Sequence, residues 1–181
     1  MTKARLQTML PYAGIPAAAI AAFILQMRRI DSFTLLRFQL LIIIGYIVAV
    51  SDIKEKRIPN SLVLAMLLGW AMIMVPQLFL QTDSAIALLA DSALGFAIGG
   101  GMFFLVYILS RKGLGGGDVK FMAATGLFLG VFGILPAMLC GTVLASLFGF
   151  VLIILKKIGR KDTIPLAPFL YVGILTTIYL W

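Results

Sequence analysis

The side chains that could do chemistry in this sequence are few. Its 181 residues include no histidine, and the single cysteine, Cys140, lies inside a long apolar run. An intrachain disulfide and a cysteine-cluster zinc site are therefore excluded. The histidine chemistry that usually moves protons is missing as well. What remains for catalysis is carboxylate, amine and hydroxyl.

Two aspartates stand out by their settings. Asp118 lies in the stretch KGLGGGDVKF, which holds four glycines between two apolar runs, and Asp52 ends another apolar run at the start of DIKEKRIPN. Each has a purely structural interpretation. Asp118 can be the N-cap of a helix that starts at Val119, with the glycines forming a tight turn. Asp52 can be an acid neutralised by the basic residues that follow it.

A pair of carboxylates can hydrolyse a peptide bond without histidine, cysteine, metal or any other cofactor. The ionised carboxylate removes a proton from water, while the protonated one donates to the carbonyl oxygen. Mutual repulsion keeps one proton on the pair, which titrates as a unit. If Asp52 and Asp118 meet in space, they can form such a site.

The elements that must position these acids are membrane helices. Of all residues 62% are hydrophobic and only 12% are charged, and the mean hydropathy is +1.10. Soluble domains have about 45–50% apolar and about 25% charged residues, so this is a membrane protein. Its net charge of +8 is loop charge that sets orientation, and we expect no nucleic-acid partner, only lipid and protein.

Apolar runs predict the individual spans. We expect all of them to be helices, because an open strand in lipid leaves its backbone unsatisfied. They cover residues 8–27, 36–51, 61–80, 88–109, 119–130, 133–155 and 164–181. The prediction is an all-α, polytopic membrane helix bundle of six to seven transmembrane helices in one domain, 1–181, with 1–30 as its less diagnostic part.

Two of these runs need comment. Residues 119–130 are too few to cross about 30 Å of hydrocarbon unless Gly130 to Gly133 is itself buried in the protein, so we expect a tilted or broken helix there. The first run can be a cleaved signal peptide, but its twenty apolar residues suit a retained anchor better.

Lys and Arg residues predict the orientation. With the N-terminus in the cytoplasm, twelve of the 15 lie on the cytoplasmic side and three lie outside. The twelve are Lys3, Arg5, Lys54, Lys56, Arg57, Arg111, Lys112, Lys120, Lys156, Lys157, Arg160 and Lys161; the three are Arg28, Arg29 and Arg37. This bias predicts a multi-pass protein of the cytoplasmic (inner) membrane with its C-terminus outside.

The same topology brings the two acids together. Two spans separate Asp52 from Asp118, and an even number of crossings returns the chain to the face from which it started. Both acids are therefore expected at the cytoplasmic edge of the bilayer. Ionisable groups at such positions cost desolvation and are functional candidates by default.

These residues carry a resemblance to a known family. DIKEKRIPN, from Asp52 to Asn60, resembles the first aspartate motif of the type IV prepilin peptidase and preflagellin peptidase family. GGGDVK, from Gly115 to Lys120, is similar to the family's Gly-x-Gly-Asp motif. IPLAPFL, from Ile164 to Leu170, resembles a segment that in relatives more often contains Pro-Phe-Gly-Pro. The resemblance covers roughly residues 30–181.

The resemblance implies an integral-membrane aspartic endopeptidase. Its substrates would be type IV prepilins, pseudopilins or preflagellins, from which it removes a short basic leader at the cytoplasmic membrane surface. Asp52 and Asp118 match the family's catalytic aspartates. Many bacterial relatives also N-methylate the new terminus and carry an insert with paired cysteines. This sequence has no such insert, which implies a peptidase without methyltransferase activity.

Neighbouring residues have expected roles of their own. Gly115, Gly116 and Gly117 form an active-site loop that lets another backbone approach. Lys120 can pair with Asp118, position substrate or extend to the interface.

Two further residues flank the first aspartate. Glu55 is expected to attract the basic leader, or else to pair with its basic neighbours. Asn60, or the serine after it, is expected to cap the helix of the third run.

Two other functions were compatible with the residues alone. A small transporter or channel subunit can use membrane-edge carboxylates to bind a cation, but the acids are predicted at one edge rather than near the midplane, and no repeated halves are visible. A non-catalytic assembly factor of a pilus or secretion machine would have no need to keep both acids. The peptidase interpretation accounts for both motifs and is the one we adopt.

Overall fold

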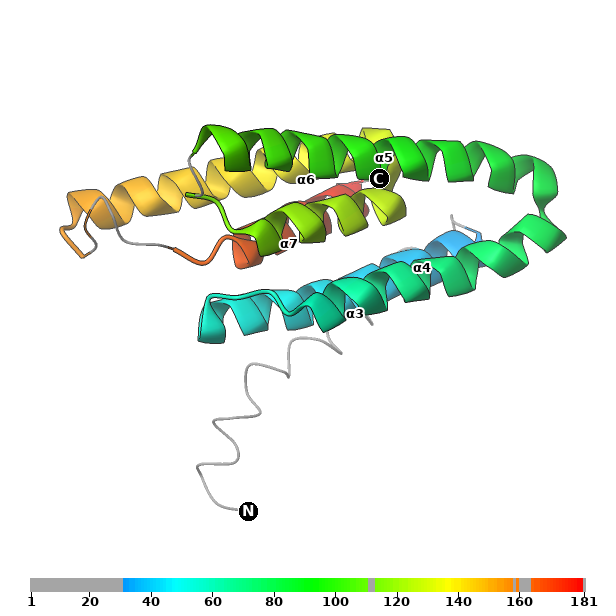
Figure 1. Cartoon of the computed structure of the whole chain (residues 1–181), viewed down its shortest axis with the longest axis horizontal. Helices are drawn as coiled ribbons and strands as arrows, with labels where there is room; N and C mark the ends of the chain where they lie inside the picture. The colour runs from blue at the N-terminus through cyan, green and yellow to red at the C-terminus, as the bar shows by residue number, and fades with distance from the viewer. Residues whose placement is uncertain (1–30, 111–112, 158, 160–163, 181) are drawn as a thin grey trace, which may run out of the picture.

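The computed structural model describes residues 31–110, 113–157, 159 and 164–180. All secondary structure in these ranges is helical, which confirms the all-α membrane bundle. The first apolar run and the question of its retention lie outside the described residues. The helices are α3 (Ser32–Glu55), α4 (Asn60–Leu80), α5 (Thr82–Leu109), α6 (Gly116–Ile154) and α7 (Ala167–Leu180) (Figure 1).

Four of the helices, α3 to α6, are long and apolar enough to cross a membrane. Helix α7 has 14 residues, which gives it a length of about 21 Å, less than the hydrocarbon core. It is nevertheless well buried, packing against α6 and α3. Within the described residues, the predicted span 164–181 is therefore a short helix buried in the bundle.

Helix α6 is broken at Gly130. The residue has φ 65° and ψ −171°, a conformation that is open to glycine but strained for other residues. Figure 1 shows the chain reversing there, and Gly99 of α5 lies close to both Met122 and Ile134, on either side of the break. Gly130 and Gly133 are both buried. The break therefore accounts for the short run 119–130, which ends inside the protein.

The second half of α6 begins with a cap from another helix. Val131 donates its backbone N–H to Oδ1 of Asp91 in α5, at 3.1 Å. The first N–H groups of a helix have no partner within it, so a carboxylate there stabilises the new start. Asp91 also interacts electrostatically with the buried Arg37 of α3. A polar link through α3, α5 and α6 thus surrounds the reversal.

Helix α5 packs closely against both halves of α6. A side chain at Gly95 would collide with the carbonyl oxygen of Gly126, and one at Gly99 with that of Met122. Small residues at helix crossings let backbones approach, which matters in lipid, where van der Waals packing drives association. The first half of α6 is thereby fixed along α5.

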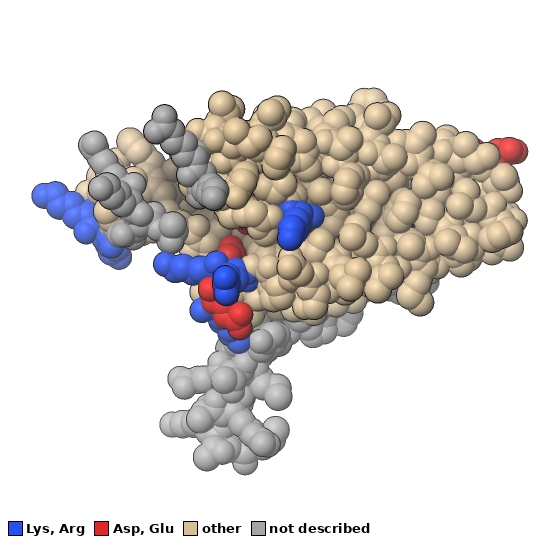
Figure 2. Space-filling view, viewed as in Figure 1, with Lys and Arg blue, Asp and Glu red and all other residues tan. Residues whose placement is uncertain are grey.

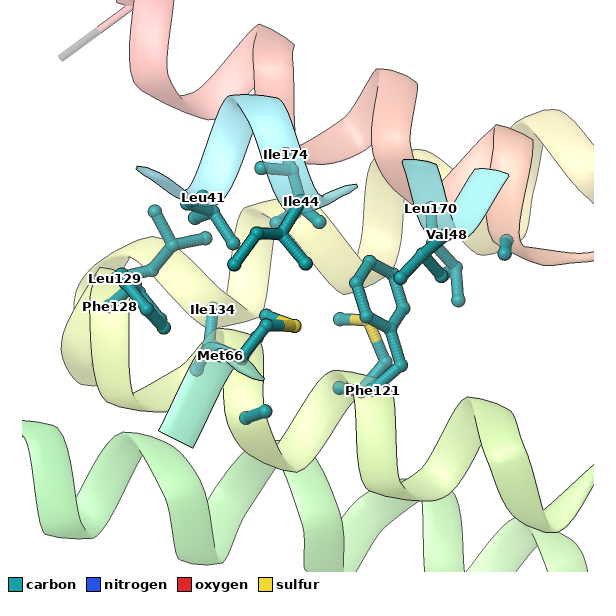
Figure 3. Packing of buried hydrophobic residues seen from close by; sticks show 14 of the residues in the cluster. Leu41, Ile44, Val48, Met66, Phe121, Phe128, Leu129, Ile134, Leu170 and Ile174 are labelled. Carbon is teal, nitrogen blue, oxygen red and sulfur yellow. The ribbon is translucent and has the colours of Figure 1, made fainter. Parts of the chain in front are cut away.

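The core lies where α3, α6 and α7 meet. Figure 3 shows Leu41 and Val48 of α3, Phe121 and Phe128 of α6, and Ile174 of α7 converging. All five side chains are nearly or fully inaccessible. They hold the first half of α6 in the middle of the bundle, with α5 on its other side.

One end of the bundle, which we call the site end, holds the end of α3 and the starts of α4, α6 and α7. In Figure 1 it lies on the left. Figure 2 shows that most Lys and Arg side chains visible on this face gather toward that end, whereas the remainder is largely uncharged. An uncharged middle with charge at one end suits a protein embedded in lipid.

Candidate active site

Asp52 lies in the last turn of α3, and its side chain is buried. The helix ends because Lys56 adopts a left-handed conformation, φ 49°, and donates its N–H to the carbonyl oxygen of Asp52. The carboxylate is held from the opposite end of the sequence. Ala167, the first residue of α7, donates its N–H to Oδ2 of Asp52 at 3.0 Å.

Asp118 lies in the first turn of α6 and is also buried. The helix starts before it, at Gly116, with Gly115 at the N-cap position. Asp118 is therefore not the N-cap of a helix starting at Val119. Its Oδ1 is buried and accepts no hydrogen bond from the described residues.

The three glycines before Asp118 have different surroundings. A Cβ at Gly115 would lie 2.7 Å from Oδ2 of Asp118, so the carboxylate folds back over this glycine. A Cβ at Gly117 would lie 3.0 Å from the Cβ of Ile58, which belongs to the stretch after Asp52. A Cβ at Gly116 would meet no atom within 4 Å. A methyl group at Gly115 or Gly117 would therefore press on a neighbouring side chain, whereas one at Gly116 would not.

The two aspartates line one cavity of about 570 Å³ at the site end. They are close enough to interact electrostatically. The structure also brings Glu55 and all three loop glycines to this cavity. Its remaining lining comes from the turn after α3 and the start of α4: Lys56, Arg57, Ile58, Pro59 and Asn60. Residues 66 positions apart in sequence therefore share one polar space, as the even number of crossings predicts.

Lys120 lies two residues after Asp118 in α6 and contacts Asn60. Its Nζ donates to Oδ1 of Asn60 at 3.0 Å, joining α6 to the start of α4. In the structure Lys120 therefore pairs with Asn60 and not with Asp118. The expected capping role of Asn60 is also wrong, because the N-cap of α4 is Pro59 and no side chain caps it.

Two contributors to the site were not found from the sequence. Ala167 binds Asp52 through its backbone N–H, and the identity of a residue does not indicate which acceptor its backbone N–H will bind. The departure from the family pattern at Leu166 and Ala167 is consistent with this, since a main-chain donor is indifferent to most side chains. Asn60 was noticed, but for a cap that its side chain does not make.

The arrangement is suited to proton transfer. Two buried carboxylates face a polar cavity at the edge of an apolar bundle, one oriented by Ala167 and the other by the turn at Gly115. No group of three or more His, Cys, Asp or Glu side chains comes together as metal ligands within the described ranges. Two such carboxylates can act as an acid–base pair.

Comparison with known proteins gives the family. Residues 39–154 match the model of the type IV leader peptidase family. The chain belongs to this family. The matched range includes Asp52 and Asp118 and ends before Ala167. It therefore confirms the resemblance stated from the two aspartate motifs.

Two curated relatives are similar over most of the chain. One is the prepilin leader peptidase/N-methyltransferase of Bacillus subtilis (strain 168), 30% identical over 129 residues, which are 70% of this chain and 48% of the relative. The other is the protein of the same name from Xanthomonas campestris pv. campestris, 27% identical over 143 residues, 75% of this chain and 47% of the relative. The chain thus spans about half the length of these relatives. No solved structure matches it.

Proposed function

We propose that this protein is a membrane-embedded aspartic endopeptidase that removes the short basic leader of type IV prepilin-like proteins. The observation that carries the proposal is the shared cavity of Asp52 and Asp118. Family membership supports the substrate class, since both relatives are named for the prepilin leader. Burial of both carboxylates in an apolar bundle strengthens electrostatic effects in the site.

In the proposed mechanism each carboxylate accepts one proton and donates one proton. The ionised carboxylate takes a proton from water, whose oxygen attacks the scissile carbonyl, while the protonated carboxylate gives its proton to the carbonyl oxygen. Collapse of the tetrahedral intermediate then breaks the C–N bond. The carboxylate that received the proton from water gives it to the leaving amine, and the other carboxylate takes the proton of the hydroxyl that becomes the new carbonyl, which restores the singly protonated pair. In this scheme Ala167 is a positioning residue, because its N–H holds Oδ2 of Asp52.

The proposed location is the cytoplasmic face of the inner membrane. The bias of Lys and Arg along the sequence supports it, and most of the Lys and Arg side chains visible in Figure 2 lie toward the end of the bundle that holds Asp52 and Asp118. In a Cys140→Ser background, a cysteine replacing Arg57 should resist an impermeant thiol reagent in intact cells, whereas one replacing Asp83 should react. Labelling of both positions from outside would contradict this orientation.

The proposal is limited to peptide cleavage. We expect no N-methyl transfer by these 181 residues, because Cys140 is their only cysteine and the methylating members of the family have paired cysteines in an insert. The test is an assay of purified protein with S-adenosylmethionine and a processed prepilin. Methylation of the new terminus would contradict this part.

The proposed cleavage is tested by co-expression with prepilins encoded in the same genome. Mass spectrometry should find the prepilin shortened by its leader with the wild-type protein and full length with Asp52→Asn. If every prepilin of that genome keeps its leader in the presence of folded wild-type protein, the proposed function is contradicted.

A further inference from the structure

A second cavity adjoins the polar one and is almost entirely apolar. It has a volume of about 510 Å³ and lies between α4 and α5, with the first half of α6 as its floor. Figure 1 shows α4 and α5 apart from one another at this level, with the first half of α6 between them. We call this cavity the α4–α5 groove. Its lining residues are Val63, Leu67, Phe96, Ala97, Gly100, Gly101, Phe104, Val119, Lys120 and Ala123.

The groove begins beside Asp118. Val119 and Lys120, which line its site end, directly follow the aspartate in α6. The hydrogen bond from Lys120 to Asn60 joins a residue of the groove to a residue of the polar cavity. The polar cavity, which holds three acids, and the apolar α4–α5 groove are therefore neighbours, and the Lys120–Asn60 hydrogen bond lies between them.

Gly101 leaves the α5 wall of the groove without a side chain. It lies inside α5, where glycine costs roughly 0.5–1 kcal/mol relative to alanine. A Cβ there would meet nothing within 4 Å, so no packing in the described structure requires a glycine. Its neighbour Gly100 differs, because a Cβ there would come within 2.9 Å of Ala123. A bare backbone facing an apolar groove lets another helix approach closely.

We propose that the α4–α5 groove binds the apolar helix of the prepilin substrate, with the scissile bond over the Lys120–Asn60 hydrogen bond and the basic leader in the polar cavity. The proposal rests on the proposed function. In the proposed substrate a short basic leader precedes an apolar helix. This is the same order of polarity as the polar cavity, which holds three acids and the two bases Lys56 and Arg57, and the apolar groove beside it. The groove admits only one face of a helix, whose remainder stays in lipid.

The test compares two substrates and two variants. One substrate is a full-length prepilin from the same genome, and the other is a synthetic peptide with its leader and scissile bond but without the helix. Gly101→Leu adds a side chain at the wall of the groove, where its Cβ would meet no atom within 4 Å. Ala145→Leu is the matched control, because it places the same side chain in a separate apolar cavity between α5, α6 and α7.

Gly101→Leu should raise KM for the full-length prepilin about tenfold and leave kcat within about twofold, since it removes binding remote from the reacting bond. Its kinetics with the peptide, and all kinetics of Ala145→Leu, should match the wild type. An unchanged KM for the prepilin would overturn the groove as the docking site. So would an equal rise with both substrates, or a rise with Ala145→Leu instead. If the wild type cleaves neither substrate, the proposed function itself fails.

A second measurement identifies the occupant. A photoreactive reagent attached at Gly101→Cys in a Cys140→Ser background should cross-link to the helix of the bound prepilin. A cross-link that goes instead to residues 1–30 of the same chain, to a second copy, or to lipid alone would overturn the proposal.

Discussion

The backbone N–H of Ala167 donates a hydrogen bond to Oδ2 of Asp52 at 3.0 Å, between residues 115 positions apart in sequence. This contact joins the start of α7 to the end of α3. It explains why a helix too short to cross the membrane is packed in the middle of the bundle, with its first residue at the site. In the proposed mechanism the contact orients one of the two carboxylates.

Replacing Ala167 by proline tests this positioning role. Proline has no N–H, and it is favoured at the first position of a helix, which Ala167 occupies in α7. A hydrogen bond to a charged group contributes about 1.5–3 kcal/mol, so kcat should fall about 10- to 100-fold. The measurement is cleavage of a prepilin at saturating concentration.

Ala167→Gly is the matched control, since it keeps the N–H while removing the methyl group. It should retain most of the activity lost in Ala167→Pro, and both variants should have similar melting temperatures. Equal activity of the proline and glycine variants would show that the hydrogen bond has no part in catalysis.

The glycines before Asp118 give a second prediction. Gly115→Ala places a methyl group against the Asp118 carboxylate, whereas Gly116→Ala places one in open space. Because a shift of about 1 Å in a reacting group can cost about a hundredfold in rate, kcat of Gly115→Ala should be at least about tenfold below that of Gly116→Ala. The reverse order of activity would refute the packing argument for this loop.

Much of the site follows from sequence. The even number of spans between Asp52 and Asp118 predicts that they meet, as they do in one cavity. The shortness of run 119–130 predicts a tilted or broken helix, and in the structure α6 is broken at Gly130. Both predictions rest on global constraints, the thickness of the bilayer and the need to return to one face. Such constraints are insensitive to the details of side-chain packing.

Contacts between distant segments do not follow in the same way. The bond of Ala167 to Asp52 uses a main-chain donor, and the cap of Val131 by Asp91 joins residues 40 positions apart. Asn60 has the residue type of a helix cap, but in the fold its side chain accepts from Lys120 instead. These partners depend on which helices pack side by side, which periodicity and hydropathy do not specify.

Glu55 is predicted to act in leader binding. It is exposed at the rim of the polar cavity, where its charge can attract a basic leader. Glu55→Lys should raise KM for the prepilin and leave kcat nearly unchanged, and Glu55→Gln should give a smaller rise in the same direction. If the kinetics of Glu55→Lys at low salt equal those of the wild type, Glu55 does not contribute to leader binding.

The chain reversal gives a prediction of stability. Asp91→Ala removes the cap of Val131, a contact of about 1–2 kcal/mol, and should lower the melting temperature in detergent by about 2–8 °C. Asp91→Asn keeps an acceptor oxygen, so its melting temperature should fall less. Gly130→Ala should be at least as damaging, because its methyl group would meet the Asp91 carboxylate in a strained conformation.

Gly101→Ala is the control for this series, since it adds a methyl group to α5 in open space and should not lower stability. If Gly130→Ala melts at the wild-type temperature, as Gly101→Ala should, the account of the reversal is wrong.

The central claim is that Asp52 and Asp118 together cleave the leader, and its most direct test is the single-turnover rate of the purified protein. Asp52→Asn and Asp118→Asn, each with the melting temperature of the wild type, should both be slower by at least about a hundredfold, because an amide cannot exchange the proton. An equimolar mixture of the two variants should be no faster. Either variant cleaving the prepilin within about threefold of the wild-type rate would contradict the two-aspartate mechanism.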